Sequence, residues 1–229
     1  MTKSRIKTPN EILDDFDFKA GAFSRDNSAV VLDTGAVIDV IHSTRSHDRI
    51  CREQGVGRDD YVSARSLFSA IGQNSRLVVL PSVYVELMKH SNSKINHYTR
   101  EIDEDTRGLI EQLASDSFEY MSLVDFTNFC SFDEIRYDVH NTTLEACNGC
   151  SKKQDEGYSM VDKDILLYSG LLTQGHLTKD KETLDLKKVT VLSSDRHVLC
   201  GVDFMVREFS GKYNKLFPVS TRIGVRNGI

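Results

Sequence analysis

Short apolar runs, separated by stretches with helical spacing, dominate the pattern of this chain. Four of the runs are rich in β-branched or aromatic residues and are bounded by polar residues, which is typical of buried strands. They are Ala29–Leu32, Leu77–Leu80, Phe118–Leu123 and Val189–Leu192. A last short strand is predicted near Leu216–Val219.

The segments next to these runs place apolar residues three and four positions apart, as amphipathic helices do. Such spacing follows the first run at Val37, Ile38 and Ile41, and it recurs after the second run and on both sides of the fourth. Continuous apolar strands that alternate with helices predict a parallel sheet covered by helices on both faces. The fold class expected from the pattern is therefore α/β.

The length and composition favour one domain. The chain has 229 residues, of which 39% are hydrophobic, and this suits a single α/β domain with additions. We expect an N-terminal arm at 1–27 and a domain at 28–229. Within the domain we expect an acidic helical insertion at about 89–116 and a polar loop at about 148–160.

Two further features bear on the surroundings of the protein. No apolar run approaches the roughly 20 residues of a membrane span, so no membrane partner is expected. The five cysteines are odd in number and lie mostly in apolar surroundings, which favours a reducing, cytoplasmic location over a disulfide scaffold.

Acidic residues stand at four places where the predicted strands and helices meet. Asp33 directly follows the first strand, Glu86 lies in an apolar helical start after the second, and Asp195 follows the fourth. Asp162 and Asp164 stand at the mouth of an apolar helix. Taken singly, each acid has a plain alternative as a helix cap or a surface residue of a first helical turn.

Taken together, the acids predict a metal site. If the strands are parallel, these carboxylates gather at the carboxyl edge of the sheet, where open α/β sheets bind ligands. Bare carboxylates at one place repel each other. A hard cation with oxygen ligands, Mg²⁺ or Mn²⁺, would relieve that repulsion and could activate water at a phosphodiester.

At these residues the chain resembles the PIN-domain nuclease family. The resemblance rests on Val-Val-Leu-Asp33-Thr-Gly-Ala-Val-Ile-Asp39, on Leu-Pro-Ser-Val-Tyr-Val-Glu86-Leu, on the Asp162/Asp164 helix, and on Val-Leu-Ser-Ser-Asp195-Arg-His-Val-Leu. It implies a three-layer α/β/α fold, a mostly parallel central sheet, and an endoribonuclease that cleaves single-stranded RNA.

The resemblance also implies roles for individual residues. Asp33, Glu86, Asp195 and one of Asp162 and Asp164 would bind the metal ion or its water. Two residues on one helix are rotated about 200° apart if they lie two positions apart, so both cannot point inward. We expect Asp164 to be the ligand and Asp162 to cap the helix. Two roles stay open for Thr34, whose hydroxyl would either orient the Asp33 carboxylate or simply start the helix. The Ser193 hydroxyl is expected to support the acids.

The route by which RNA approaches is predicted from local charge. Net charge is −5, and residues 101–134 hold ten acids against one base. Residues 205–229 hold five bases against one acid and interleave them with aromatic residues. Bases neutralise phosphates and exposed rings stack on unpaired nucleobases. The residues predicted to contact RNA are Lys212, Lys215, Arg222 and Arg226.

Alternatives stay open at this point. The protein could be a catalytically degenerate PIN-like subunit that binds RNA or serves as a scaffold. As an enzyme it could be a toxin or an RNA-processing nuclease. Its protein partner could accordingly be a second copy, an antitoxin or a processing factor.

Overall fold

The structure of the chain is a computed structural model. It describes residues 28–53, 55, 62–71, 75–92, 102, 104–122, 124–125, 158–174, 176–179, 182–185, 188–193, 195–209 and 219–222.

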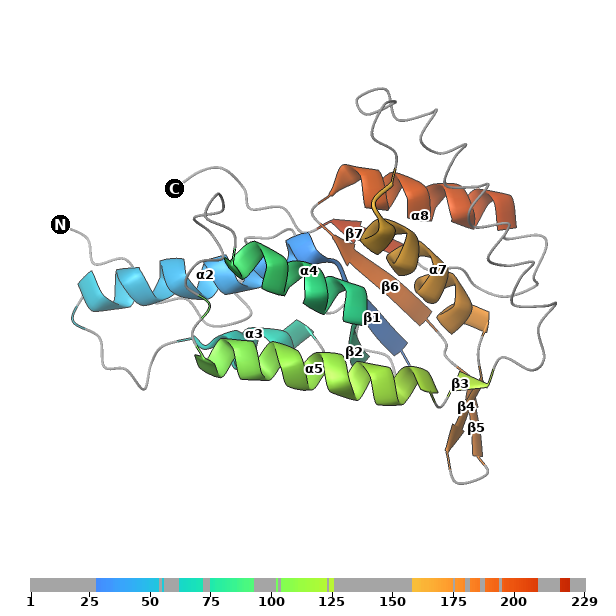
Figure 1. The fold of residues 1–229 in the computed structure, drawn as a ribbon, viewed down its shortest axis with the longest axis horizontal. Coiled ribbons are helices and arrows are strands. Elements are labelled where there is room, and N and C mark those ends of the chain that lie inside the picture. The colour runs from blue at the N-terminus through green and yellow to red at the C-terminus, as the bar shows by residue number, and fades with distance from the viewer. Residues whose placement is uncertain are drawn as a thin grey trace.

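The centre of the fold is a four-stranded parallel sheet (Figure 1). Its strands, in the spatial order β2-β1-β6-β7, are β2 (Ser75–Val79), β1 (Ser28–Leu32), β6 (Lys188–Ser193) and β7 (Val219–Arg222). The predictions of the first, second and fourth apolar runs as strands are confirmed. The predicted strand at Leu216–Val219 shares only Val219 with β7.

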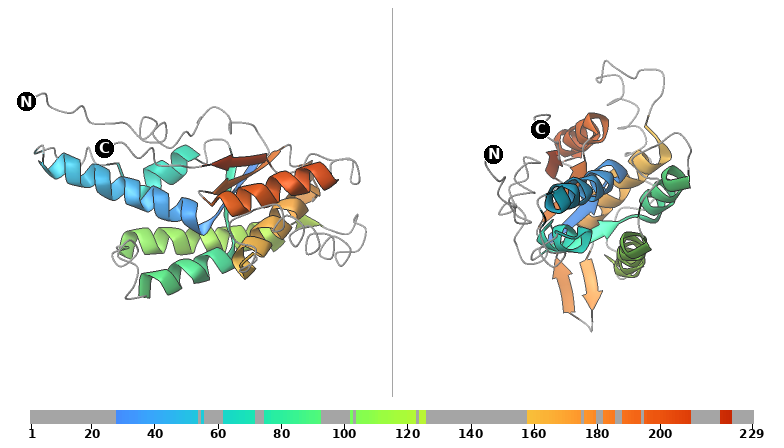
Figure 2. Two further views of the ribbon diagram at one scale, coloured as in Figure 1. Left: turned by 90° about the horizontal axis from the view of Figure 1, so that it is seen from above. Right: turned by 90° about the vertical axis from the view of Figure 1, so that its left-hand side faces the viewer.

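Helices cover both faces of this sheet. Successive side chains of a strand point to opposite faces, and Ala29 to Leu32 and Val189 to Ser193 are all at most 2% exposed. The strands accordingly lie between helices in Figure 2. The helices are α2 (Thr34–Glu53), α3 (Ala64–Ile71), α4 (Pro81–Asn92), α5 (Glu104–Ser122), α7 (Met160–Gln174) and α8 (Arg196–Phe209). The expected α/β class, with a parallel sheet between helical layers, is confirmed.

The prediction of a strand at Phe118–Leu123 is wrong, because α5 continues through Ser122. Part of the segment expected to be an acidic insertion also belongs to α5, whose Ile110 and Ala114 lie in the core. Helix α5 packs along β2. Its buried Ser117 hydroxyl accepts a hydrogen bond from the Val79 N–H at 2.9 Å. A helix side chain therefore satisfies a backbone N–H of the edge strand β2. In a sheet, a neighbouring strand would ordinarily do this.

Replacing Ser117 with alanine should destabilise the fold by about 1–3 kcal/mol, because the Val79 N–H loses its partner in a buried position. Chemical denaturation measures the effect. The matched control is Ser69→Ala at an exposed position of α3, where a change within about 0.5 kcal/mol is expected. Equal stability of the two variants would show that the Ser117 bond contributes nothing.

A second, smaller sheet was not predicted. Its antiparallel strands are β3 (Val124–Asp125), β4 (His176–Lys179) and β5 (Glu182–Asp185). The β4–β5 hairpin extends away from the helices in Figure 1 and in the right panel of Figure 2. It lies between α7 and β6 in the sequence, so it lengthens the connection that brings β6 next to β1.

The described part of the chain bears on two sequence features, the apolar runs and the cysteines. Among its helices, none combines the length and the apolar character that crossing a bilayer requires. Cys51 is buried and Cys200 is partly buried, and both are free thiols.

Candidate functional site

The carboxyl ends of the parallel strands meet at one edge of the sheet, and α2, α4 and α8 begin there. Asp33 is the first residue after β1. Its N–H continues the pairing with β6 through a 3.0 Å hydrogen bond to the Leu192 carbonyl. Its own carbonyl accepts the Val37 N–H at 3.1 Å, so Asp33 also occupies the N-cap position of α2. Both readings of Asp33 from the sequence, sheet edge and helix cap, describe one position.

Ser193 joins two of the acids. Its hydroxyl, fully buried, donates to Oδ2 of Asp33 at 2.5 Å and accepts the Asp195 N–H at 2.9 Å. The expected support of the acids by Ser193 is thus present as a contact. The hydroxyl fixes the direction of the Asp33 carboxylate and ties it to the turn that carries Asp195.

Asp195 begins α8 and is exposed. Its Oδ1 accepts the His197 N–H at 2.7 Å, and its carbonyl accepts the Leu199 N–H at 3.2 Å. These are the bonds of an N-cap residue. The cap holds one carboxylate oxygen against the helix.

Glu86 reaches the same edge from α4. This helix starts at Pro81, a favoured first helical residue because it has no N–H to satisfy. The Thr34 hydroxyl, at the start of α2, donates to Oε2 of Glu86 at 2.5 Å. Thr34 is itself buried, at 6% exposed. The structure therefore places Thr34 on Glu86, whereas the sequence suggested that it orients Asp33.

Asp162 enters from the start of α7. The Ser159 hydroxyl accepts the Asp162 N–H at 3.1 Å, and Oδ2 of Asp162 accepts the Ser159 N–H at 2.9 Å. This reciprocal pair is a capping box, which satisfies two backbone donors of the first turn. The expected capping role of Asp162 is present in the structure.

Electrostatics link the acids. The pKa of Asp33 is raised from 3.8 to about 6. Burial is the largest cause and the negative charges of Asp162 and Asp195 act in the same direction, while hydrogen bonds from the Ser193 hydroxyl and the Thr34 backbone lower the pKa. Burial likewise raises the pKa of Asp162, and the charges of Asp195 and Glu86 add to that effect. The charges of Asp162 and Asp195 thus act on Asp33, and those of Asp195 and Glu86 act on Asp162. We call Asp33, Glu86, Asp162 and Asp195 the acid cluster.

Asp164 is not among the charges that raise the pKa of Asp33 or Asp162. It is half-buried on α7, two positions past Asp162. The helical rotation that separates the two residues explains why only one of them faces the cluster. The contacts at this edge therefore involve Asp162, and the proposals below use Asp162. The choice of Asp164 as the metal ligand stays a prediction.

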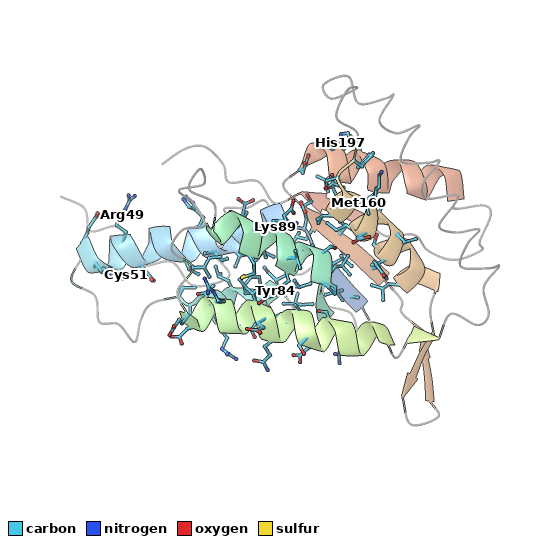
Figure 3. The ribbon with its side chains drawn as sticks, in the orientation of Figure 1. Arg49, Cys51, Tyr84, Lys89, Met160 and His197 are labelled. Carbon is cyan, nitrogen blue, oxygen red and sulfur yellow. The ribbon has the colours of Figure 1, made fainter. Side chains whose placement is uncertain are left out.

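One residue that sequence reasoning missed lies beside the cluster. Tyr158 is buried, and its hydroxyl donates to the His197 carbonyl at 3.1 Å. Its ring centroid lies 4.0 Å from that of the His197 imidazole. Figure 3 shows His197 at the start of α8 and Met160 at the start of α7, on the same side of the molecule. No motif in the sequence predicts this contact.

Three of the four residues predicted to contact RNA, Lys212, Lys215 and Arg226, lie outside the described residues, as does the N-terminal arm at 1–27. Arg222 is the last residue of β7.

No protein-family model, curated protein or solved structure matches this chain.

The chemistry of the acid cluster can be compared with the needs of a metal ion. Mg²⁺ and Mn²⁺ prefer oxygen ligands, and every member of the cluster supplies a carboxylate. Among the described residues, however, no three His, Cys, Asp or Glu side chains stand close enough to hold one ion. The donor type fits a hard cation. Binding would require the carboxylates to move closer together than their present hydrogen bonds to Ser193, Thr34 and the backbone hold them.

Proposed function

We propose that this protein is a metal-dependent endoribonuclease of PIN-like type that hydrolyses single-stranded RNA. The observation that carries the proposal is the environment of Asp33. This carboxylate is buried at the carboxyl edge of a parallel sheet, is held by Ser193, and faces the charges of Asp162 and Asp195. Such an arrangement is costly for a fold unless a cation or a proton compensates it.

The acid cluster would hold Mg²⁺ or Mn²⁺. In a phosphodiesterase such an ion lowers the pKa of water and neutralises charge that develops on the phosphate oxygens. Ser193 would keep Asp33 oriented, and Thr34 would do the same for Glu86. Asp195, the exposed member, stands where water and substrate can reach it.

The reaction proposed is a hydrolysis without a covalent enzyme intermediate. An oxygen of water bonds to phosphorus, and the bond from phosphorus to one ribose oxygen breaks. The proton of the water leaves to a base, and the departing ribose oxygen takes up a proton. Asp33, whose pKa is raised to about 6 mainly by burial, is a described group at the sheet edge that can accept such a proton.

RNA is proposed as the substrate on two grounds. One is the resemblance of the four acidic motifs to PIN-domain nucleases. The other is the clustered bases and aromatic residues of 205–229, a composition suited to unpaired nucleic acid. A cytoplasmic location, suggested by the cysteines, belongs to the same proposal.

The test compares the wild-type chain with Asp33→Asn on a single-stranded RNA oligonucleotide with Mn²⁺. We expect the substitution to lower the rate of cleavage by at least about 100-fold, the order seen when one preorganised electrostatic group is removed from an active site. Asp116→Asn, at an exposed position of α5, is the matched control and should cleave like the wild type. Equal cleavage by wild type and Asp33→Asn would refute the proposed activity.

The second candidate is a degenerate PIN-like subunit that binds RNA or serves as a scaffold. It is favoured by the spacing of the described acids, which do not form a ready metal site, and by the net charge of −5. Isothermal titration with Mn²⁺ separates the two. Absence of heat at millimolar Mn²⁺ would favour the scaffold, whereas saturable binding lost in Asp33→Asn would favour the enzyme.

A further inference from the structure

We propose that two exposed apolar residues beside the acid cluster, Met160 and Val85, contact nucleobases of the RNA, and that Lys89 binds a phosphate next to them. We call these three residues the rim. The proposal rests on the proposed function, because it takes single-stranded RNA as the ligand of this edge of the sheet. It concerns contacts with RNA alone and requires no bound metal ion.

The exposure of the two apolar residues is the first observation. Among the described residues, Met160 and Val85 are the large hydrophobic side chains that lie exposed, at 73% and 48%. Single exposed apolar residues are common on protein surfaces and by themselves mark nothing. Here both stand next to members of the acid cluster, since Val85 precedes Glu86 and Met160 lies two positions before Asp162. The exposed apolar side chains thus stand beside the place where the substrate is proposed to bind.

Two neighbouring helices carry the rim. Val85 lies on α4 and Met160 on α7, and these helices pack against each other. The charge of Glu86 acts on Asp162, so the parts of the two helices that hold the rim lie near one another. Lys89 follows Val85 by four positions, which places both on one face of α4. Figure 3 shows Lys89 on α4 and Met160 at the start of α7.

Lys89 supplies the positive charge that a phosphate requires. It is exposed on α4, and within the described part of the chain it has no ion-pair partner. A lysine that neutralises a phosphate releases the counterions held there, which makes binding dependent on salt. One face of α4 therefore offers a charge for the RNA backbone and an apolar surface for a base, the two kinds of contact that proteins make with single strands.

Met160 suits a nucleobase by its chemistry. The side chain is unbranched and its thioether is polarizable, so it adapts to aromatic rings and interacts favourably with them. It is the first residue of α7, directly after the capping residue Ser159, and lies outside the core. Its neighbours one turn along the helix, Lys163 and Asp164, carry opposite charges. The start of α7 is therefore expected to contribute apolar contact rather than charge.

The alternative is that the three rim residues are ordinary surface positions. In that case their replacement changes neither the affinity for RNA nor its dependence on salt. The carboxylates of the acid cluster repel RNA in the wild type and in every rim variant alike. A comparison between these proteins therefore cancels that repulsion and reports the rim alone.

The experiment measures binding of a fluorescent single-stranded RNA oligonucleotide to the full chain by anisotropy, over a series of salt concentrations and with EDTA present. We expect Met160→Ser to weaken binding about 5-fold, within the range that one sulfur–aromatic contact supplies. Val85→Ser should act in the same direction by a smaller factor, because valine offers less surface. Met160→Leu keeps an apolar side chain and should retain most of the affinity.

Lys89→Gln should weaken binding and also reduce the slope of log affinity against log salt by about 0.7, the contribution of one phosphate in a single strand. Arg107→Gln, at an exposed position of α5, is the matched control. It removes one positive charge elsewhere on the surface and should leave the affinity and the slope unchanged.

A second oligonucleotide of equal length, made of ribose and phosphate without nucleobases, separates the two kinds of contact. On this ligand Met160→Ser should bind like the wild type, because the base that Met160 contacts is gone. Lys89→Gln should remain weaker than the wild type, because the phosphates are still present.

The outcomes are distinct. Wild-type affinity in Met160→Ser and Val85→Ser would overturn the nucleobase contact and point to a protein as the occupant of the exposed pair. An equal loss on the ligand without bases would overturn it as well. An unchanged affinity and slope in Lys89→Gln would overturn the phosphate contact. Equal cleavage by wild type and Asp33→Asn, with the rim effects present, would refute the nuclease activity alone. A wild-type chain that binds no RNA would overturn both proposals.

Discussion

Asp33→Asn is expected to stabilise the metal-free protein at neutral pH by roughly 3 kcal/mol. Burial raises the pKa of Asp33 from 3.8 to about 6, so the folded state holds this carboxylate in its charged form at a cost. A shift of that size corresponds to about 1.4 kcal/mol for each pKa unit. Asparagine has nearly the same shape, still accepts the Ser193 hydroxyl and carries no charge. The variant that loses activity should thus be the more stable protein.

The stability difference between Asp33→Asn and the wild type should depend on pH. A carboxylate whose pKa is higher in the folded state binds more protons there between pH 3.8 and about 6, so its contribution to stability falls as pH rises through that window. The difference between Asp33→Asn and wild type should be near zero below pH 4. It should grow to its full value above about pH 6.5. Thermal unfolding should then show a shift of roughly 6–12 °C for a chain of this size.

Mn²⁺ should reverse the order. An ion that binds only the folded wild type stabilises it by RT ln(1 + [Mn²⁺]/Kd), and Asp33→Asn should gain little. Asp116→Asn, at an exposed position of α5, serves as the control for the substitution itself, and its stability should lie within about 0.5 kcal/mol of the wild type. A stability difference for Asp33→Asn that does not change with pH would mean that Asp33 carries its charge without cost.

The second large effect should separate Asp162 from Asp164. Asp162→Asn keeps an oxygen that can accept the Ser159 N–H, so the capping box survives and mainly the charge is lost. We expect kcat/KM for RNA cleavage to fall about 100-fold in Asp162→Asn. Asp164→Asn should stay within about 3-fold of wild type, because Asp164 is rotated about 200° from Asp162 around α7.

Steady-state cleavage assays on the two variants check this prediction, and circular dichroism verifies that α7 keeps its helix in both. Full activity of Asp162→Asn with loss in Asp164→Asn would restore the preference drawn from the sequence. It would also show that the first turn of α7 rearranges when metal and RNA are bound.

Much of the sheet could be predicted because its strands are buried on both faces. β1, β2 and β6 each contain a short run of apolar residues with few other readings. The run Phe118–Leu123 is also short and largely apolar, yet its residues up to Ser122 belong to a helix that begins at Glu104. The apolar residues of a buried helix and of a strand cannot be told apart over six positions, and only the preceding helical turns decide between them. The β4–β5 hairpin was missed since His176–Lys179 and Glu182–Asp185 are mostly polar.

The positions of the acids at the ends of the strands could be predicted better than the contacts that these acids make. Asp33, Glu86 and Asp195 follow from one rule, namely that parallel strands end at a common edge. The capping box with Ser159 distinguishes Asp162 from Asp164. The hydrogen bond from the Tyr158 hydroxyl to the His197 carbonyl joins residues 39 positions apart, which no local pattern encodes. Thr34 was expected to act on its neighbour and instead reaches Glu86, 52 positions away.

The pairing of β1 with β6 has a consequence for the way the protein is made. Asp33 and Ser193 are 160 positions apart, and β1 lacks its central partner until β6 has been synthesised. Ribosomes add about 5–20 residues each second, so roughly ten to thirty seconds separate the two residues during translation. Long-range parallel pairing is also slow to form. A nascent chain therefore carries Asp33 without Asp162, Ser193 and Asp195 during most of its synthesis, and the environment of the Asp33 carboxylate is completed only late.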